Sequence, residues 1–465
     1  MSFLRRAAFL SFVFLLSLDA QGVEHQYQIR VNPERTRLTV TARLAAPQRT
    51  IRSSNASTAD FLIAAKSCEG QRLDVDGRRI RLPRDVTCLR YEYDLAAAAR
   101  RSATRRRTQL RPGIVVTSPG DWLFRPRLTE GTTLRIAWNL PQGDALSVPW
   151  TRLDDKEHVY ELGSSPRSAD AIVAFGNFDY QEVEVPGATL RIGLLHEAAG
   201  PMDQEKLVEW LRQAAIGVTQ AHGRFPNPSP QVLLVPSRST WGSSPVPFGR
   251  VVRNGGESVQ FFVDPDRKLD DYLKDWTATH EFAHLLLPYV GDRWVSEGFA
   301  SYYQNVLMAR SGHYTEGTAW AKLHAGIERA RAVRPRGSPT TSRSRMMVYW
   351  SGAALALVAD VRLRRLSGGE ESLDKLLSRL GACCLPSDRS WDAEEFFLKL
   401  DSLSDYSVFS ETYRELANRP GVPKLDALYR SLGIVPTSDR TVQVTDSAPE
   451  AALRRSLMLG PPNDT

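Results

Sequence analysis

The chain has 465 residues and a formal net charge of +7, with 42% hydrophobic and 24% charged residues. This composition excludes a wholly disordered chain, and the length allows two or three domains with their own cores. Arginines supply much of the positive charge, notably Arg100, Arg101 and the run 105–107, which we interpret as a solvated loop. The alternative is an anionic partner such as a membrane surface. No aromatic residues interleave with these arginines, so we expect no nucleic-acid partner.

The N-terminus has the pattern of a secretory signal peptide. Arg5 and Arg6 precede an apolar run over residues 7–18, and Ala20 is a candidate for the residue before the cleavage site. The run is too short to span a bilayer, and no later stretch reaches the required length without a charge. We therefore expect a signal peptide over residues 1–20, a periplasmic or extracellular location, and no transmembrane segment beyond the signal peptide.

Residues 25–195 favour β-structure. Apolar and polar side chains alternate there in short runs, for example at 133–138 and 189–195, and Pro, Gly and Asp separate the runs. This pattern predicts an N-terminal β-sandwich-like domain over residues 21–185.

Helical spacing begins near residue 202 and dominates from residue 269 onward. We expect a catalytic domain over 186–345, a helical domain over 346–435, and a loosely packed tail with one short helix over 436–465. The predicted fold class is therefore α+β with several domains.

The four cysteines fit an oxidising compartment. Cys68 and Cys88 lie in the predicted β region and are candidates to staple a hairpin or loop. Cys383 and Cys384 are adjacent, and three outcomes are open for them: a vicinal disulfide, pairing elsewhere, or buried thiols. None of the four has the C-x-x-C spacing of a zinc ribbon or redox motif.

The main chemical motif is His-Glu-Phe-Ala-His, from His280 to His284, on a strongly helical segment. Residues four apart lie above one another on a helix, so both imidazoles can reach one ion. Glu281 then lies beside that ion, where a bound water would be positioned, and is the predicted catalytic base. Histidines on an apolar helix face also occur as simple core residues, so the interpretation depends on a third ligand.

That third ligand is expected from a second helix. Pro288 and Gly291 interrupt the first helix, and a second helical run follows. If the chain reverses there, His284 and Glu297 each lie about five residues from the bend, roughly 7 Å back at the rise of an α-helix. Antiparallel packing would bring them level. We therefore predict one Zn²⁺ per chain, held by His280, His284 and Glu297, with a fourth position open for water.

Two segments resemble the gluzincin metallopeptidases, especially the glycyl aminopeptidase family: His-Glu-Phe-Ala-His and Trp-Val-Ser-Glu-Gly-Phe-Ala-Ser-Tyr-Tyr. In that family the Glu before Gly-Phe is the third zinc ligand, which corresponds to Glu297. The interval of 13 residues from His284 is shorter than the leucyl/alanyl aminopeptidases usually have. The resemblance covers residues 230–380. It implies a thermolysin-like catalytic domain with a pair of zinc-binding helices, acting on a peptide or protein substrate.

A further segment, Val-Tyr-Trp-Ser-Gly-Ala-Ala-Leu at 348–355, is similar to the Tyr-x-Lys-Gly-Ala segment of these families. Their tyrosine stabilises the oxyanion of the reaction, and the resemblance implies this role for Tyr349. Ser351 replaces the usual Lys. The alternative for Tyr349 is an aromatic residue packed on the core at the start of a helix.

The resemblance also implies a Gly-rich substrate strand upstream of the zinc helix, within residues 248–258. Its candidate substrate-binding residues are Gly255, Gly256 and Glu257, and Glu257 is the candidate anchor for a free amine. The order of residues here departs from the family pattern. The glycines would let a peptide backbone approach this edge closely.

The predicted function is a zinc-dependent metallopeptidase, of aminopeptidase type, that hydrolyses peptide bonds through a metal-activated water. The alternatives are an endopeptidase of the same fold and a catalytically degenerate homologue that acts as a binding module. The sequence contains no G-x-S-x-G elbow, P-loop or G-x-G-x-x-G fingerprint, which disfavours other enzyme classes. We also expect no additional PDZ domain. The sequence does not specify an oligomeric state.

Overall fold

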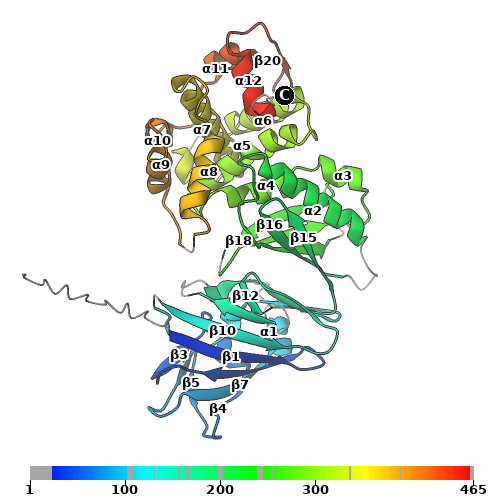
Figure 1. The fold of residues 1–465 in the computed structure, drawn as a ribbon, viewed down its shortest axis with the longest axis vertical. Coiled ribbons are helices and arrows are strands. Elements are labelled where there is room, and N and C mark those ends of the chain that lie inside the picture. Colours follow the sequence, from blue (N-terminus) through cyan, green and yellow to red (C-terminus); the bar gives the residue numbers. More distant parts are fainter. Residues whose placement is uncertain are drawn as a thin grey trace, which may run out of the picture.

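The computed structural model describes residues 23–101, 108–129, 131–154, 158–163, 168–196, 203–237, 244–253, 255–334, 337–387 and 389–460. The expected signal peptide over 1–20 and the arginines at 105–107 lie outside these residues. The described chain forms two lobes (Figure 1): a β-rich N-terminal lobe, and a second lobe in which helices cover a smaller sheet. The fold class is thus a mixed α and β architecture of more than one domain, as predicted.

The N-terminal lobe is built on a seven-stranded sheet. Its strands, in spatial order, are β12 (Thr151–Asp154), β13 (Val159–Leu162), β10 (Thr132–Asn139), β1 (Val23–Val31), β2 (Arg37–Arg43), β7 (Cys88–Asp94) and β4 (Leu62–Ser67). A four-stranded sheet has the order β11 (Ala145–Ser147), β14 (Val173–Gly176), β9 (Ile114–Thr117) and β8 (Gln109–Arg111). A three-stranded sheet of β3 (Thr50–Arg52), β6 (Arg79–Arg81) and β5 (Asp74–Asp76), and one helix, α1 (Leu95–Arg101), complete the lobe.

Alternating side chains form the core of this lobe. On β1, Tyr27 and Ile29 are buried whereas Gln28 between them is exposed, as a sheet with one buried face requires. Their cluster also contains Phe175 from the four-stranded sheet, so the two sheets share one core. The Cys68–Cys88 disulfide joins the segment after β4 to the first residue of β7, which is the staple considered for these cysteines.

The second lobe contains a five-stranded sheet. Its order is β15 (Asp179–Val185), β16 (Ala188–Leu194), β17 (Gln231–Pro236), β19 (Ser258–Val263) and β18 (Phe248–Val252). β16, β17 and β19 are parallel, whereas β15 and β18 are antiparallel strands at the two edges. The predicted end of the β domain at residue 185 is therefore wrong. A two-residue turn with Gly187 at a φ of 81° pairs β15 with β16, so β15 belongs to the second lobe.

Eleven described helices belong to the second lobe. They are α2 (Gln204–Thr219), α3 (Leu269–Lys274), α4 (Thr277–Ala283), α5 (Arg293–Arg310), α6 (Glu316–Arg331), α7 (Arg345–Leu366), α8 (Leu373–Cys384), α9 (Ala393–Asp401), α10 (Val408–Ala417), α11 (Asp426–Leu432) and α12 (Ala451–Leu459). A short pair of strands, β20 (Ile434–Pro436) and β21 (Val442–Val444), lies between α11 and α12. One hydrophobic core runs from the sheet through these helices, so residue 345 does not separate two cores.

The helix α12 is well packed, which corrects the expectation of a loose tail for this part of residues 436–465. Leu457 and Met458 of α12 are fully buried in the core of the second lobe. Arg454 is also buried and donates from Nε to Glu316 Oε1 at 2.7 Å, on α6. The amphipathic spacing of these three residues on α12 accounts for the docking.

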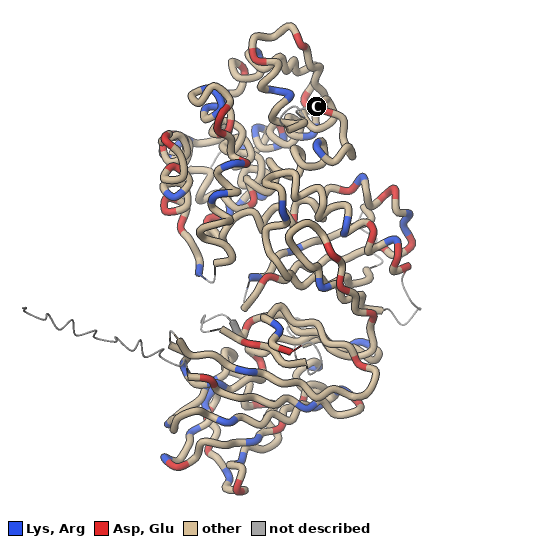
Figure 2. The backbone as a smooth tube through the Cα atoms, in the orientation of Figure 1, with Lys and Arg blue, Asp and Glu red and all other residues tan. Residues whose placement is uncertain are grey.

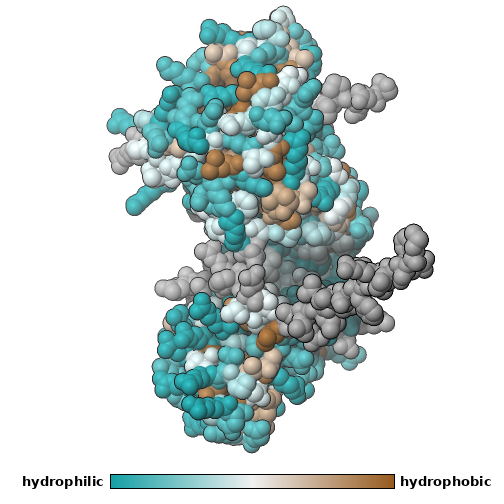
Figure 3. Space-filling model, turned by 60° about the vertical axis from the view of Figure 1, so that its left-hand side comes forward, coloured by the Kyte–Doolittle hydropathy of each residue, from teal (hydrophilic) through white to brown (hydrophobic). Residues whose placement is uncertain are grey.

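Among the described residues, α7 is the one helix with the length and hydropathy of a membrane span. Within its apolar 18-residue window, 78% of the residues are buried inside the protein, where α7 packs on α5 and α6. Burial in the core therefore accounts for its apolar character. On the face in Figure 3, hydrophobic residues occur in small separate patches.

Two glycines let α5 and α7 cross at close range. A Cβ on Gly298 would overlap the backbone of Gly352, and a Cβ on Gly352 would lie 2.8 Å from Gly298 Cα. Beside this crossing, Trp294 Nε1 donates to Ser351 Oγ at 2.8 Å. Ser351, at the position of the Lys in the Tyr-x-Lys-Gly-Ala segment, thus links α5 and α7 through this hydrogen bond. The crossing matters because α5 and α7 carry two of the predicted active-site residues.

We predict that Gly352→Ala lowers the free energy of unfolding by about 1–3 kcal/mol, because the added methyl group overpacks the crossing. Chemical denaturation measures this change. Gly317→Ala is the matched control, since Gly317 lies in α6 and a methyl group there would have no other atom within 4 Å. An unchanged stability in Gly352→Ala would contradict the close packing of α5 on α7.

Candidate active site

The two histidines of the motif lie at the end of a fully buried helix. His280 is on α4, and His284 begins the 3₁₀ turn that follows it. Every residue of α4 is buried, so packing on all sides fixes the helix. The two imidazole rings lie edge to face with centroids 4.9 Å apart. Both rings therefore border the same space, as their spacing on a helix predicts.

An arginine from the sheet holds the C-terminal end of this helix. Arg253, next to the last residue of β18, donates to the carbonyl oxygens of His284 and Leu287, the latter at 2.6 Å. The His284 carbonyl also accepts from Leu287 N at 3.3 Å, and a positive charge is favourable at a helix C-terminus. Arg253 thereby couples the position of His284 to the edge strand of the sheet.

Glu297 approaches the two histidines from α5. Asp292 caps this helix by accepting from Trp294 N at 2.8 Å, which fixes the start of α5 one turn before Glu297. Glu297 Oε2 lies 3.5 Å from Nε2 of His280 and 3.5 Å from Nε2 of His284. The ligand atoms of these three residues lie within 4.8 Å of one another.

The donor set fits Zn²⁺. Tetrahedral zinc with ligand distances of about 2.0–2.2 Å separates its ligand atoms by about 3.3–3.5 Å, close to the spacing found here. Glu297 Oε2 is buried and has no hydrogen-bond partner among the described residues, which is costly unless a cation compensates it. Burial raises the pKa of Glu297, but the two imidazoles outweigh burial and lower it overall. The carboxylate is therefore ionised, as a metal ligand must be.

Gln304 orients the first histidine. Its Oε1 lies 2.8 Å from His280 Nδ1, so the ring donates from Nδ1 and presents the Nε2 lone pair toward Glu297. Gln304 was not among the residues predicted from the sequence. Its spacing could have indicated it: Gln304 follows Glu297 by seven residues on α5, and residues seven apart lie on the same face of a helix.

The predicted base, Glu281, lies between α4 and the edge strand. It is 8% exposed, and burial raises the pKa of its carboxyl, an effect that His280 and His284 oppose. Gly249 of β18 lies directly against it: a Cβ at Gly249 would be 2.7 Å from Glu281 Cγ and 2.9 Å from Oε1. Only glycine lets the edge strand approach Glu281 this closely.

Tyr349, on the first turn of α7, faces the same site. Its ring is parallel to that of His280, with centroids 5.9 Å apart. Burial and the nearby carboxylate of Glu297 raise the pKa of Tyr349, so the hydroxyl keeps its proton at neutral pH. The position of this hydroxyl is compatible with the role of hydrogen-bond donor that the resemblance implies.

These side chains line one cleft of about 860 Å³, together with β18 and the residues near 288–291 and 387–390. Glu281, His284, Glu297 and Tyr349 all contribute to its wall. The structure therefore brings the predicted metal ligands, base and tyrosine together around one space.

Gly255, Gly256 and Glu257 do not line this cleft, which corrects their expected substrate-binding role. They lie in the turn between β18 and β19. A Cβ on Gly256, whose φ is 132°, would overlap the carbonyl of Pro149, so this glycine allows the two lobes to meet. Glu257 is half-buried beside Arg253, with Oε1 and Nε 3.8 Å apart. An ion pair inside the turn, rather than a substrate, occupies this carboxylate.

Comparison with known proteins agrees with this arrangement. Residues 277–354 match the family model of the M61 glycyl aminopeptidases. This match confirms the resemblance over the segment that carries the predicted metal ligands, the predicted base and Tyr349. No curated protein matches the chain.

Among solved structures, an aminopeptidase N family protein from Idiomarina loihiensis superposes with a TM-score of 0.64 and 15% identity, over 91% of this chain and 82% of that chain. An M1 zinc metallopeptidase of Deinococcus radiodurans with a bound Tyr-Ser-Ala substrate has a TM-score of 0.51 and 15% identity, over 87% of this chain and 95% of that chain. At this identity the likeness shows a shared fold.

The family match over the site and the His-His-Glu group together define the protein as a zinc metallopeptidase. Within that class, its active-site region is similar to the M61 glycyl aminopeptidases.

We predict that Gln304→Leu lowers zinc affinity by about 10–100-fold, because His280 loses the partner that fixes its tautomer. Competition with a chromogenic chelator measures the affinity. Gln304→Glu, which keeps an acceptor for Nδ1–H, is the control and should retain most of the affinity. Equal affinities in all three proteins would contradict the orienting role.

We also predict that Gly249→Ala lowers kcat/KM for peptides by at least about tenfold, since a displacement near 1 Å in an active site has effects of this size or larger. Zinc content should not change, because the three atoms nearest to the added methyl group belong to Glu281 and Thr277, neither of which is a proposed metal ligand. Gly163→Ala, at a site with open space, is the control. Full activity in Gly249→Ala would show that the edge strand does not position Glu281.

Proposed function

We propose that this protein hydrolyses peptide bonds with one zinc ion held by His280, His284 and Glu297, and with Glu281 as the catalytic base. The observation that carries the proposal is the convergence of one carboxylate oxygen on two imidazole nitrogens at 3.5 Å each, beside a buried glutamate in an open cleft. All the groups that the reaction needs are present, which disfavours a catalytically degenerate binding module.

When bound, zinc would lower the pKa of a water molecule and polarise the substrate carbonyl. Glu281 takes a proton from the attacking water and passes it to the leaving nitrogen. Tyr349, protonated at neutral pH, donates a hydrogen bond to the developing oxyanion, a contribution of about 2–4 kcal/mol. Gln304 holds the His280 ring during these steps. The half-buried cleft limits the water around the reacting groups.

Two modes of cleavage, removal of N-terminal residues and cleavage within a peptide chain, each have support. The family match to glycyl aminopeptidases supports removal of N-terminal residues. The lining of the cleft favours the endopeptidase alternative: among the described residues its only carboxylates are Glu281 and Glu297, and the expected amine anchor, Glu257, lies elsewhere. N-terminally acetylated peptides separate the two modes, because only an endopeptidase should cleave them.

We further propose that the protein acts in the periplasm or outside the cell. Its disulfides, Cys68–Cys88 and Cys383–Cys384, are stable in oxidising compartments and support this location. Cell fractionation with N-terminal sequencing of the mature chain tests the proposal. Recovery of the unprocessed chain in the cytoplasm would contradict it.

We predict that Glu281→Gln retains zinc but loses activity by at least about 10²-fold, because the amide cannot accept the proton from water. Glu297→Ala should instead lose zinc as well as activity. Elemental analysis of the purified variants and an assay on mixed peptides measure both effects. Normal hydrolysis by Glu281→Gln, or full zinc occupancy in Glu297→Ala, would contradict these roles.

A further inference from the structure

The active-site cleft is strongly biased in charge. Its described lining contains five arginines, at positions 250, 253, 293, 345 and 389, and only two carboxylates, Glu281 and Glu297. The whole chain, in contrast, has 60 Lys and Arg against 53 Asp and Glu, and Figure 2 shows both signs distributed over both lobes. The excess of arginine is therefore a local property of this cleft.

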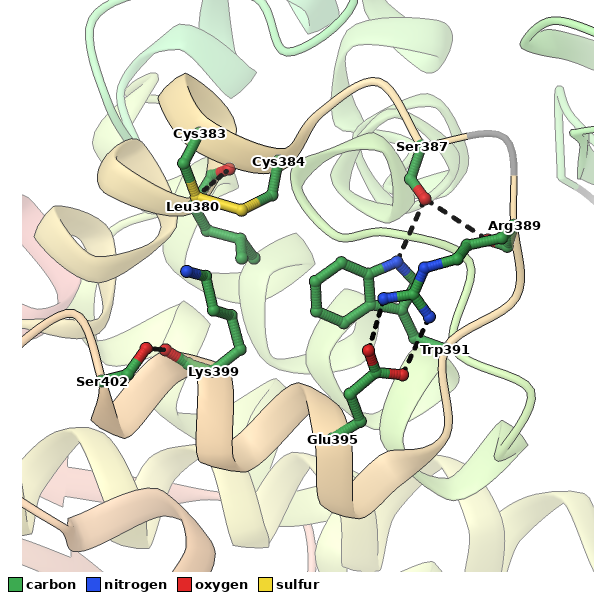
Figure 4. Close-up of a disulfide and its surroundings, with 9 residues drawn as sticks. All are labelled: Leu380, Cys383, Cys384, Ser387, Arg389, Trp391, Glu395, Lys399 and Ser402. Atoms are coloured by element: carbon green, nitrogen blue, oxygen red, sulfur yellow. Dashed lines mark hydrogen bonds and ion pairs between the residues drawn. A yellow bond between two sulfur atoms is a disulfide. The ribbon is translucent and has the colours of Figure 1, made fainter. Parts of the chain in front are cut away.

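Three of the five arginines already have structural partners. Arg250 donates from Nε to Gln260 Oε1 at 2.7 Å. Arg253 caps the end of the zinc helix. Arg389 forms a two-point ion pair with Glu395 and lies over the Trp391 ring, 4.4 Å from its centroid (Figure 4). These arginines shape the wall and the rim of the cleft but are not free to bind a substrate.

The vicinal disulfide lies close to this rim. Cys383–Cys384 ends α8, and the chain then runs through Ser387 to Arg389 and Ser390, all of which line the cleft (Figure 4). Ser387 Oγ accepts from Trp391 Nε1 at 3.0 Å. Ser387 and Arg389, on this rim, both contact Trp391 or its neighbour Glu395.

The other two arginines are available. Arg293 lies one helical turn before Glu297 on α5, and Arg345 lies one turn before Tyr349 on α7. The Arg293 side chain is 62% exposed, and its Nη2 is 3.8 Å from Glu297 Oε1. Arg345 is exposed and makes no ion pair or hydrogen bond to a described residue.

The packing of the helices brings both arginines to the same end. Trp294 near the start of α5 pairs with Ser351 in the second turn of α7, and Tyr302 further along α5 donates to Asp360 further along α7. The two helices are therefore parallel, and both begin at the cleft. Arg293, one turn before Glu297, and Arg345, one turn before Tyr349, therefore both face the substrate space.

No described acidic residue near them neutralises the cleft. Asp292 accepts from the backbone at the start of α5, and it lines an adjoining depression with Asp392, Glu394 and Glu395, which meets the cleft at Gly291 and Ser390. The two glutamates within the cleft are the proposed base and metal ligand. A substrate ammonium group would therefore meet arginines, whereas a substrate carboxylate would find two guanidinium groups without strong partners.

We propose that this cleft selects peptides that present a carboxylate close to the scissile bond, with Arg345 and Arg293 as specificity-determining residues. The inference rests on the proposed peptidase function. The planar guanidinium group binds a carboxylate through two parallel hydrogen bonds, which gives specificity as well as affinity. An Asp or Glu side chain and the C-terminal carboxylate of a short peptide are two sources of the same group.

Matched peptides test the proposal. One set is acetylated and amidated at its ends and differs only in Glu, Gln or Lys beside the cleaved bond; a second set is neutral inside and ends in a carboxylate or an amide. We expect kcat/KM of the wild-type enzyme to be at least about tenfold higher with the carboxylate of a pair than with its amide. The preference should shrink as ionic strength rises. The set that shows it identifies the source of the carboxylate.

The same peptides are then titrated into zinc-loaded Glu281→Gln protein, whose affinity for them does not depend on turnover.

Arg345→Gln and Arg293→Gln should each reduce the carboxylate-to-amide ratio of kcat/KM, and zinc content is measured in parallel because Arg293 neighbours Glu297. Arg343→Gln is the control, since Arg343 is exposed on the same approach to α7 but does not line the cleft.

Equal binding and turnover of carboxylate and amide peptides would overturn the proposal, and so would a preference that persists when both arginines are replaced. Carboxylate-selective binding to Glu281→Gln without hydrolysis by the wild-type enzyme would support the cleft specificity while contradicting the peptidase function. The two claims can thus fail separately.

Discussion

The site depends on keeping one ionised carboxylate buried against two imidazoles. Glu297 Oε2 has no hydrogen bond among the described residues, and its attraction to the two imidazoles, and to the proposed zinc ion when bound, offsets its desolvation. The surrounding helices supply the geometry. The fully buried α4 fixes the histidines, the Asp292 cap sets the start of α5, and the glycine crossing brings α7 against α5. Because these constraints come from packing, the ligand atoms are positioned before any metal binds.

Local periodicity predicted this part of the molecule well. The spacing of His280 and His284 requires only one helical turn, and the helix break at Pro288 implied the reversal that brings Glu297 back. Gln304 was missed because its role depends on the contact between two helices, which a single sequence does not reveal. For the substrate strand, in contrast, the prediction named residues that lie outside the cleft. The resemblance implied a role for Gly255, Gly256 and Glu257, but the glycine that meets the proposed catalytic glutamate is Gly249, and Gly256 serves the contact between the lobes.

The fold also divides into features that local spacing predicts and features that depend on contacts between distant elements. Alternation of buried residues such as Tyr27 and Ile29 predicted the β lobe. Its boundary was misplaced because β15 forms a hairpin with β16 at Gly187, and β16 in turn pairs with the distant strand β17. The tail was expected to be loosely packed, but Arg454 and Leu457 anchor its helix to α6 and the core. The edge strand, the zinc helices and the two available arginines together form a cleft in which catalysis and recognition come from neighbouring turns of the same helices.

The most direct test of the account is a crystal structure of the full chain with anomalous diffraction measured at the zinc absorption edge. The account predicts a single strong anomalous peak bound by Nε2 of His280, Nε2 of His284 and a carboxylate oxygen of Glu297. A peak at any other place, or a Glu297 side chain turned away from both histidines in zinc-saturated protein, would contradict the central claim.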